Sequence, residues 1–159
     1  MPIIIDGHNL LWSIQKTSEE DEPISDVQLC CIVSRYLKLI GETAEVVFDG
    51  TGPPDKDRFD NISNLEVFFA GLATDADSVI ADKIRANTAP KRLKIVSSDR
   101  MIRDAARARK AVSVKSEVFW IDLQKQLSRK RTRREPLGKR EGISESETKQ
   151  WLKLFGLEQ

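Results

Sequence analysis

Histidine and cysteine are scarce in this chain, which has one His and two Cys among 159 residues. Cys30 and Cys31 are adjacent, a spacing that fits neither a disulfide framework nor the C-x-x-C pairs of metal sites. We therefore expect both to be packing residues in a reducing cytoplasm. A chain of this length can bury a stable core without disulfides or a structural metal, and we expect one domain.

Long hydrophobic runs are also absent. No stretch approaches the roughly 18 consecutive apolar residues that a transmembrane helix requires. The amino-terminal residues Met-Pro-Ile-Ile-Ile-Asp contain no basic segment and only a short apolar one, which is not the pattern of a secretory signal. The composition, 40% hydrophobic and 32% charged, is typical of a globular protein. We expect a cytoplasmic protein that makes no contact with membranes.

Neither sign of charge predominates in the whole chain, because the formal net charge is +1. The two halves nevertheless differ, since residues 1–82 contain 16 Asp and Glu against 5 Lys and Arg, and residues 83–159 contain 9 against 21. Such a division can place an acidic pocket that attracts cations beside a basic surface that attracts a polyanion. Alternatively, folding mixes the two sets of charges and leaves no patch.

Short apolar segments alternate with helical patterns along the chain. The sequence predicts strands at 3–5, 44–48, 65–69, 93–97 and 112–114, and helices at 25–40, 75–87, 99–109 and 118–127. Ser25 with Gln28 forms a capping-box pattern, and Gly41 can supply a left-handed C-cap. Residues 14–24 are polar and predict a loop. The alternation favours an α/β fold with a central parallel sheet and helices on both faces.

The character of the chain changes after residue 127. Residues 128–142 carry seven Lys and Arg without apolar periodicity, which predicts a basic, mobile segment. A last helix is expected within 143–159, where Ser144 and Glu147 form another capping-box pattern. We expect this helix to belong to the same domain as residues 1–127.

Aspartates follow the predicted strands. Asp6, Asp49 and Asp99 come after three of them, and Asp77 lies at the start of the helix that follows another. Because the carboxyl ends of parallel strands meet at one edge of a sheet, we expect these carboxylates to converge. Like charges brought together repel, so a cation is expected among them. Carboxylate oxygens suit Mg²⁺ or Mn²⁺ better than zinc, and such an ion can support phosphodiester hydrolysis.

Each aspartate also has a structural explanation. Asp77 and Asp99 lie near helix N-termini, where capping and the helix dipole favour Asp. The two Asp-Gly pairs are ordinary residues for a turn after a strand. The functional interpretation depends on the coincidence of all four acids at equivalent strand ends.

Four motifs occur in order along the chain. They are Asp6-Gly7-His8-Asn9, Val46-Val47-Phe48-Asp49-Gly50, Ala76-Asp77-Ser78 and Ser97-Ser98-Asp99-Arg100. Together with Gly142-Ile143-Ser144-Glu145 and Trp151-Leu152-Lys153-Leu154-Phe155-Gly156, these motifs resemble the YacP-like branch of the NYN domains, within the PIN-like nuclease superfamily. The resemblance spans most of the chain. It implies a Rossmann-like PIN/NYN nuclease domain over 1–127 and metal-dependent endoribonuclease activity with Mg²⁺ or Mn²⁺.

The resemblance can be carried over residue by residue. It assigns Asp6, Asp77 and Asp99 to one or two divalent ions, and Asn9 to positioning the substrate or a metal-bound water. Asp49 matches a further acid of the family. All five are expected in the catalytic site.

Three accessory candidates are less specific. Relatives often have a second acid where this chain has Ser78, and Asp75 is a candidate replacement. Ser97 matches a small hydroxyl residue of the family, and its structural alternative is a helix cap. His8 could contact phosphate, although a loop histidine beside an active site is more often a bystander.

Basic residues supply the expected RNA contacts. The candidates are Arg100, Arg103, Arg129, Lys130, Arg131, Arg133 and Arg134. Each phosphate contact would add salt-sensitive affinity, whereas the alternative for such a run of charge is a solvated linker. The expected partner is RNA, either free or bound to the ribosome.

Two other functions stay open beside the endoribonuclease. A non-catalytic RNA-binding module could keep the same fold, and a phosphatase for small phosphomonoesters would not need the basic residues. The Asp75-x-Asp77 pair of this chain resembles the Asp-x-Asp motif of some phosphatases. Those enzymes place the motif directly after the first strand, where this chain has Asp6-Gly7-His8, so the motif does not fit. The Gly50-Thr51-Gly52 turn lacks the pattern of a dinucleotide site.

Overall fold

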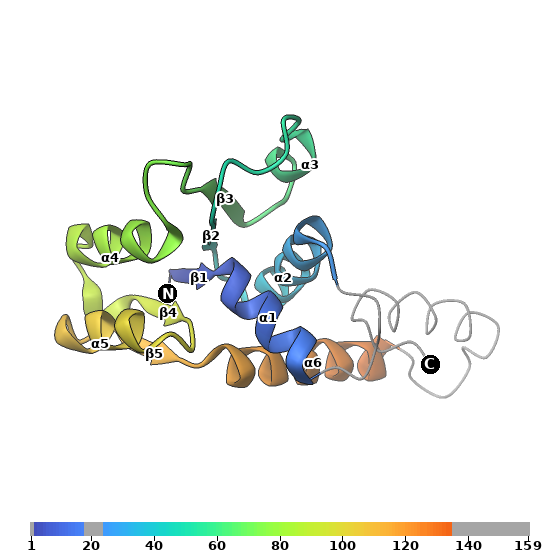
Figure 1. The fold of residues 1–159 in the computed structure, drawn as a ribbon. Coiled ribbons are helices and arrows are strands. Elements are labelled where there is room, and N and C mark those ends of the chain that lie inside the picture. Colours follow the sequence, from blue (N-terminus) through green and yellow to red (C-terminus); the bar gives the residue numbers. More distant parts are fainter. Residues whose placement is uncertain (1, 18–23, 135–159) are drawn as a thin grey trace.

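The computed structural model describes residues 2–17 and 24–134. Within them, five parallel strands form one sheet in the order β3-β2-β1-β4-β5 (Figure 1). The strands are β1 (Ile3–Asp6), β2 (Ala44–Phe48), β3 (Leu65–Phe69), β4 (Lys94–Val96) and β5 (Val112–Val114). The helices are α1 (Gly7–Thr17), α2 (Asp26–Ile40), α3 (Asp57–Asp60), α4 (Ala76–Ala86), α5 (Arg100–Ala108) and α6 (Ser116–Arg134), with a 3₁₀ turn at Pro90–Arg92.

Helices cover both faces of this sheet (Figure 1). Successive side chains of a strand point to opposite faces, so Ile3 and Ile5 pack against α1, α2 and α6 while Ile4 packs against α4 and α5. The inner strands β1, β2 and β4 are largely buried on both sides, which is why they are mostly apolar in sequence, whereas the edge strands β3 and β5 are more exposed. The predicted α/β fold class is confirmed.

The helix predicted over 25–40 is present with both of its caps. The Ser25 hydroxyl accepts from the Gln28 N–H at 3.1 Å, and the Gln28 side chain accepts from the Ser25 N–H at 2.9 Å. Gly41 ends the helix with φ 71°, in the left-handed region that glycine adopts without strain. Caps at Asp75 and Asp99 likewise explain why α4 and α5 begin one residue later than predicted.

The loop predicted over 14–24 is wrong for residues 14–17, which belong to α1. Leu10 and Ile14 are buried one helical turn apart, whereas Trp12 is 56% exposed on the opposite side of the same helix. The helix thus presents an apolar stripe to the core and a polar face to solvent. The polar residues at its end concealed this pattern in the sequence.

The helix predicted over 118–127 is longer than expected, because α6 runs from Ser116 to Arg134. Lys and Arg are good helix formers, and no Gly or Pro interrupts the run before Pro136. Residues 128–134 therefore continue this helix, which was not predicted from the sequence. Residues 135–142 and the helix predicted within 143–159 lie outside the described residues. None of the helices in the described part has the length and apolar character needed to cross a membrane.

Gly7 begins α1 directly against the ring of Phe48 in β2. A Cβ atom at this position would overlap the Phe48 ring carbons. Glycine is therefore required here by close approach, and this contact fixes how α1 leaves the sheet beside Asp6.

We expect Gly7→Ala to lower the free energy of unfolding by about 1–3 kcal/mol, because the added methyl group overpacks the Phe48 contact. In a Phe48→Leu background the same substitution should cost less, since the smaller side chain leaves room. Gly41→Ala is the control, because a Cβ at Gly41 would have no atom within 4 Å. Its cost would come only from the positive φ of 71°, which alanine adopts with strain. Its cost should be equal in both backgrounds when measured by urea denaturation. An equal cost of Gly7→Ala in both backgrounds would contradict the contact.

Candidate functional site

The strand order reverses beside β1, which creates a switch point at the carboxyl edge of the sheet. The chain goes from β1 outward to β2 and β3, and then returns to β4 on the other side of β1. Ligand sites of open α/β sheets form at such a point. Asp6 is the last residue of β1, and Ser97, Ser98 and Asp99 follow β4. The switch point therefore brings two of the predicted motifs together.

Asp6 is a carboxylate buried in the centre of this edge, with 4% exposure. Burial raises its pKa to about 6, and the charges of Asp77 and Asp49 act in the same direction. The Ser97 hydroxyl donates to Asp6 Oδ2 at 3.1 Å, and the backbone N–H of Asn9 also donates to the carboxylate. Both hydrogen bonds lower the pKa but do not offset the burial.

The other predicted acids lie within electrostatic reach of one another. Burial raises the pKa of Asp77, and the charges of Asp99, Asp75 and Asp49 raise it further. In the described part of the chain, no Lys or Arg forms an ion pair with Asp6, Asp77 or Asp99. This edge thus concentrates negative charge that no ion pair within the described residues neutralises.

Asp99, Asp49 and Asp75 also hold backbone N–H groups, and of the two predicted caps, Asp77 and Asp99, the one at Asp99 is present. Asp99 caps α5, and its Oδ1 accepts from the N–H groups of Met101 and Ile102 at 2.8 and 3.3 Å. Asp49 Oδ1 accepts from the Ala76 N–H at 2.7 Å.

Asp75 rather than Asp77 caps α4. Its Oδ1 accepts from the Ser78 N–H at 2.8 Å, a bond that lowers the Asp75 pKa. Asp77 is half-buried in the first turn of α4.

The donor set fits a hard divalent cation in its chemistry, because it consists of carboxylates that are partly buried, mutually repelling and uncompensated. Its present geometry is looser than a ligand shell. Among the residues whose side chains are described, no group of three or more His, Cys, Asp and Glu is arranged to hold a metal ion. The site has the charge of a cation site and not the closed arrangement of one.

His8 and Ser97 serve as local supports. His8 Nδ1 accepts from the Asp49 N–H at 3.2 Å, and its ring lies 5.0 Å from that of Phe48. Ser97 is fully buried, and its hydroxyl accepts from the Asp99 N–H at 3.0 Å while donating to Asp6. Ser97 thus links two of the predicted acids.

A second polar cluster lies beside the acids and was not anticipated from the sequence. Asn9 Oδ1 accepts from the Ser98 N–H at 2.9 Å and from the Ser116 hydroxyl at 2.7 Å. Glu117 accepts from the hydroxyls of Ser98 and Ser13, at 2.8 and 3.2 Å. The available signal was the position of Ser116 and Glu117 just after the fifth strand, which is the placement that marked the aspartates.

The predicted RNA-binding cations are only partly described. Arg100 is exposed in the first turn of α5. Arg103 is half-buried, and its Nε is buried without a hydrogen-bond partner in the described part of the chain. Arg129 is exposed on α6. The side chains of Lys130, Arg131, Arg133 and Arg134 lie outside the described residues.

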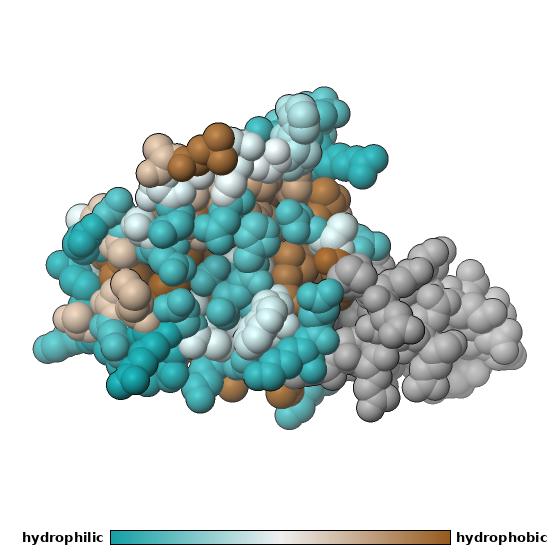
Figure 2. All heavy atoms as spheres, in the orientation of Figure 1, coloured by the Kyte–Doolittle hydropathy of each residue, from teal (hydrophilic) through white to brown (hydrophobic). Residues whose placement is uncertain are grey.

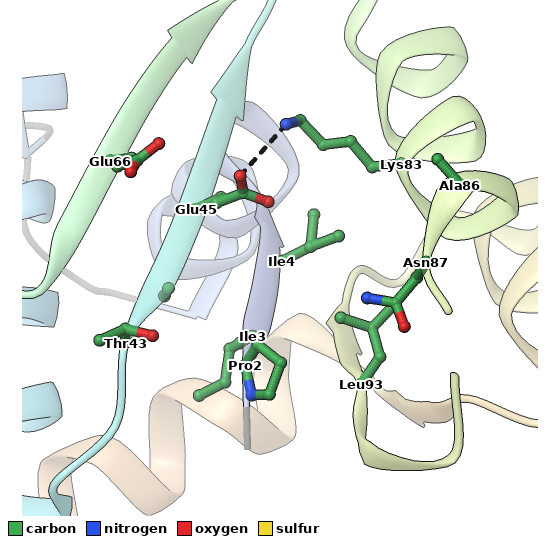
Figure 3. Close-up of a pocket in the computed structure, with 11 residues that line it drawn as sticks. Pro2, Ile3, Ile4, Thr43, Glu45, Glu66, Lys83, Ala86, Asn87 and Leu93 are labelled. Carbon is green, nitrogen blue, oxygen red and sulfur yellow. Dashed lines mark hydrogen bonds and ion pairs between the residues drawn. The ribbon is translucent and has the colours of Figure 1, made fainter. Parts of the chain in front are cut away.

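A cavity of about 550 Å³ lies at the opposite edge of the sheet, between the starts of β1 and β2 and the end of α4 (Figure 3). Lys83 Nζ lies 3.3 Å from Glu45 Oε1 there and 3.9 Å from the centre of the Phe68 ring. None of the residues lining this cavity is a predicted site residue. The cavity is therefore separate from the acidic edge.

Hydrophilic residues cover most of the surface shown in Figure 2, and of the several brown areas one lies over the connection between β3 and α4. Leu72 lies in that connection and is 90% exposed. Single exposed apolar residues are common on soluble proteins, so this one does not by itself mark a site.

Comparison with known proteins agrees with the resemblance in the sequence. The family described as YacP-like NYN domain matches residues 3–155. The crystal structure of Rae1 (YacP) from Bacillus subtilis has a TM-score of 0.67 at 18% identity, covering 98% of this chain and 92% of that one. A mutant of the same protein gives the same TM-score and identity, with coverages of 93% and 89%. At this identity the likeness shows a shared fold. No curated protein sequence matches the chain.

The raised pKa of Asp6 predicts how Asp6→Asn changes stability. An acid whose pKa rises from the ordinary 3.8 to about 6 on folding makes the fold less stable as pH increases between these values. Without added metal, Asp6→Asn should therefore raise the free energy of unfolding at pH 7, by up to about 3 kcal/mol. Most of the gain should be lost at pH 4, where Asp6 is protonated in the folded state and partly protonated in the unfolded state.

Urea denaturation at pH 4 and pH 7 measures this difference. Asp104→Asn, which removes an exposed carboxylate on α5, is the control. A loss of stability at pH 7 in Asp6→Asn would contradict the inferred strain on the carboxylate.

Proposed function

The chain belongs to the YacP-like NYN domain family, and on this premise we propose that it is a metal-dependent endoribonuclease, which hydrolyses phosphodiester bonds of RNA at the acidic edge. One observation carries the proposal. The Asp6 carboxylate is buried at the switch point among other acids, and no Lys or Arg of the described residues forms an ion pair with it. A cation brought by the solvent, together with a phosphate substrate, accounts for this arrangement.

Asp6, Asp77 and Asp99 are the residues that would hold Mg²⁺ or Mn²⁺. When bound, such an ion neutralises phosphate oxygens and lowers the pKa of a water molecule. Asp6 is held from two sides, by the Ser97 hydroxyl and the Asn9 N–H. Asp49 supports the site indirectly, because its bond to the Ala76 N–H fixes the first turn of α4, where Asp77 lies. Carboxylates anchored to backbone in this way are preorganised for a ligand.

RNA contacts are proposed for basic residues near this edge. Arg100 follows Asp99 directly and is exposed, and Arg103 lies one turn further along α5. The basic tract, defined as Arg129, Lys130, Arg131, Arg133 and Arg134, would extend the contact along the end of α6. Exposed Trp12 on α1 could stack on an unpaired base. The proposed place of action is the cytoplasm, on RNA that is free or bound to the ribosome.

A non-catalytic RNA-binding module is the second candidate. It is favoured by the fact that no three acids of the described part are arranged as metal ligands. The two candidates differ in what Mn²⁺ does, because only the nuclease requires it for turnover.

We expect Asp99→Asn to keep the fold and to lose RNA cleavage by about 100-fold or more. Asn still offers the side-chain oxygen that caps α5, and removal of one anion relieves repulsion with Asp77. Cleavage of a labelled single-stranded RNA with Mg²⁺ or Mn²⁺, and with EDTA as a blank, measures activity. Asp104→Asn on the same helix is the matched control and should retain full activity. Full activity of Asp99→Asn would show that Asp99 is not part of the site. If the unmodified protein binds RNA without metal and does not cleave it, the binding module is favoured.

The basic tract should determine affinity rather than chemistry. Replacing its five cations with Gln should weaken RNA binding and reduce the salt dependence, by about 0.7 in the logarithmic slope for each lost phosphate contact. Turnover at saturating RNA should change little, because these contacts are similar in the ground and transition states. Substitution of Arg85, Lys91 and Arg92, exposed at the opposite edge, is the control. An unchanged salt slope would mean that the tract is a solvated end of α6.

A further inference from the structure

The polar cluster beside the acids joins three elements that are distant in sequence. Asn9 belongs to the first turn of α1, Ser98 to the connection between β4 and α5, and Ser116 and Glu117 to the start of α6. Ser98 donates a hydrogen bond to Glu117, Ser116 donates one to Ser98, and both serines donate to Asn9. The cluster therefore holds Asn9 against two other segments of the fold.

The charge of Glu117 sets the direction of these hydrogen bonds. Hydrogen bonds from Ser98 and Ser13 lower its pKa, so the side chain is an ionised carboxylate that can only accept. The Ser98 hydroxyl donates to it at 2.8 Å, which leaves the Ser98 oxygen to accept the Ser116 N–H at 3.0 Å. The Ser116 hydroxyl is then directed to Asn9 Oδ1, at 2.7 Å.

This direction determines which half of the Asn9 amide is available. Oδ1 receives the Ser98 N–H as well as the Ser116 hydroxyl, so both of its lone pairs are used. A flipped amide would place its NH₂ group against the Ser98 N–H, and two donors would face each other. The two N–H groups of Nδ2 are therefore what Asn9 retains for a ligand. N–H groups can bind an anionic phosphate oxygen and cannot coordinate a cation.

We propose that Glu117 is a positioning residue, which through Ser98 and Ser116 fixes the Asn9 amide as a hydrogen-bond donor to the phosphate of the RNA substrate. The proposal rests on the proposed function and specifies how that site holds its substrate. Asn9 on this account binds RNA directly and is not a metal ligand. Glu117 acts only through Asn9.

The experiment uses the full chain and a double-mutant cycle. Glu117→Gln keeps the size of the side chain and removes its charge, so its NH₂ group can face Ser98 and reverse the hydrogen-bond direction. Asn9→Ala removes the donor itself. Tyr36→Phe is the structural control, because it removes the 2.9 Å bond from Tyr36 to Asp122 and loosens α6 without touching the cluster.

Cleavage of single-stranded RNA with Mn²⁺ gives kcat and KM for each variant. Glu117→Gln should lower kcat/KM about 10-fold, whereas in the Asn9→Ala background it should lower it no further. Tyr36→Phe should lower the unfolding temperature and leave kcat/KM unchanged. Asn9→Asp should be as inactive as Asn9→Ala, because an anion replaces the donor. A full effect of Glu117→Gln in the Asn9→Ala background, no effect in the unmodified background, or an active Asn9→Asp would each overturn the proposal.

Nuclear magnetic resonance separates this proposal from the proposed function. The side-chain NH₂ signals of Asn9, assigned by their loss in Asn9→Ala, should shift or broaden in Glu117→Gln and stay in place in Tyr36→Phe. This readout requires no cleavage. If the unmodified protein does not cut RNA, the proposed function fails while the amide signals still test the orientation. Unshifted signals in Glu117→Gln would overturn the positioning role even in an active nuclease.

Discussion

The burial of one carboxylate at the end of the central strand is the constraint on which the rest of this site depends. Asp6 lies at the carboxyl edge of the sheet where the strand order reverses, and it is buried there with 4% exposure. Two hydrogen bonds, from Ser97 and from the Asn9 backbone, retain it there against the cost of burial and the repulsion of nearby acids. The close contact of Gly7 with Phe48 also contributes to holding Asp6, because it fixes the position of α1, the helix that carries the Asn9 N–H.

The acids around Asp6 have structural and electrostatic roles at once. Asp99 and Asp75 each use Oδ1 to cap a helix, and Asp49 uses Oδ1 to hold the Ala76 N–H. In each case the charge of the carboxylate still acts on its neighbours. The charges of Asp99, Asp75 and Asp49 therefore all raise the pKa of Asp77. Capping and site formation are therefore not competing explanations for an Asp at a helix start. The backbone bond fixes the position of the charge.

Much of the fold was predictable, because parallel strands buried on both faces are continuous apolar runs and the aspartates end them. The extent of α1 was not, since its last turn is polar and its apolar stripe, Leu10 and Ile14, is short. The end of α6 was misplaced because a basic run has no apolar period and yet forms helix. The cluster around Glu117 was not predictable, because its hydrogen bonds join residues 18 to 107 positions apart. The distances among the carboxylates were not predictable for the same reason, because these acids are also far apart in the sequence.

Helix α6 connects the two regions that carry opposite charge. Its first turn is held by the cluster beside the acidic edge, and its last turn carries the basic tract. With 19 residues the helix is about 28 Å long. On the proposed function, an RNA that contacts both ends of α6 must span that distance. The length of the helix would then set a minimum length for the most tightly bound substrates. A fragment shorter than that distance would contact only one end and would be held less tightly than a longer RNA.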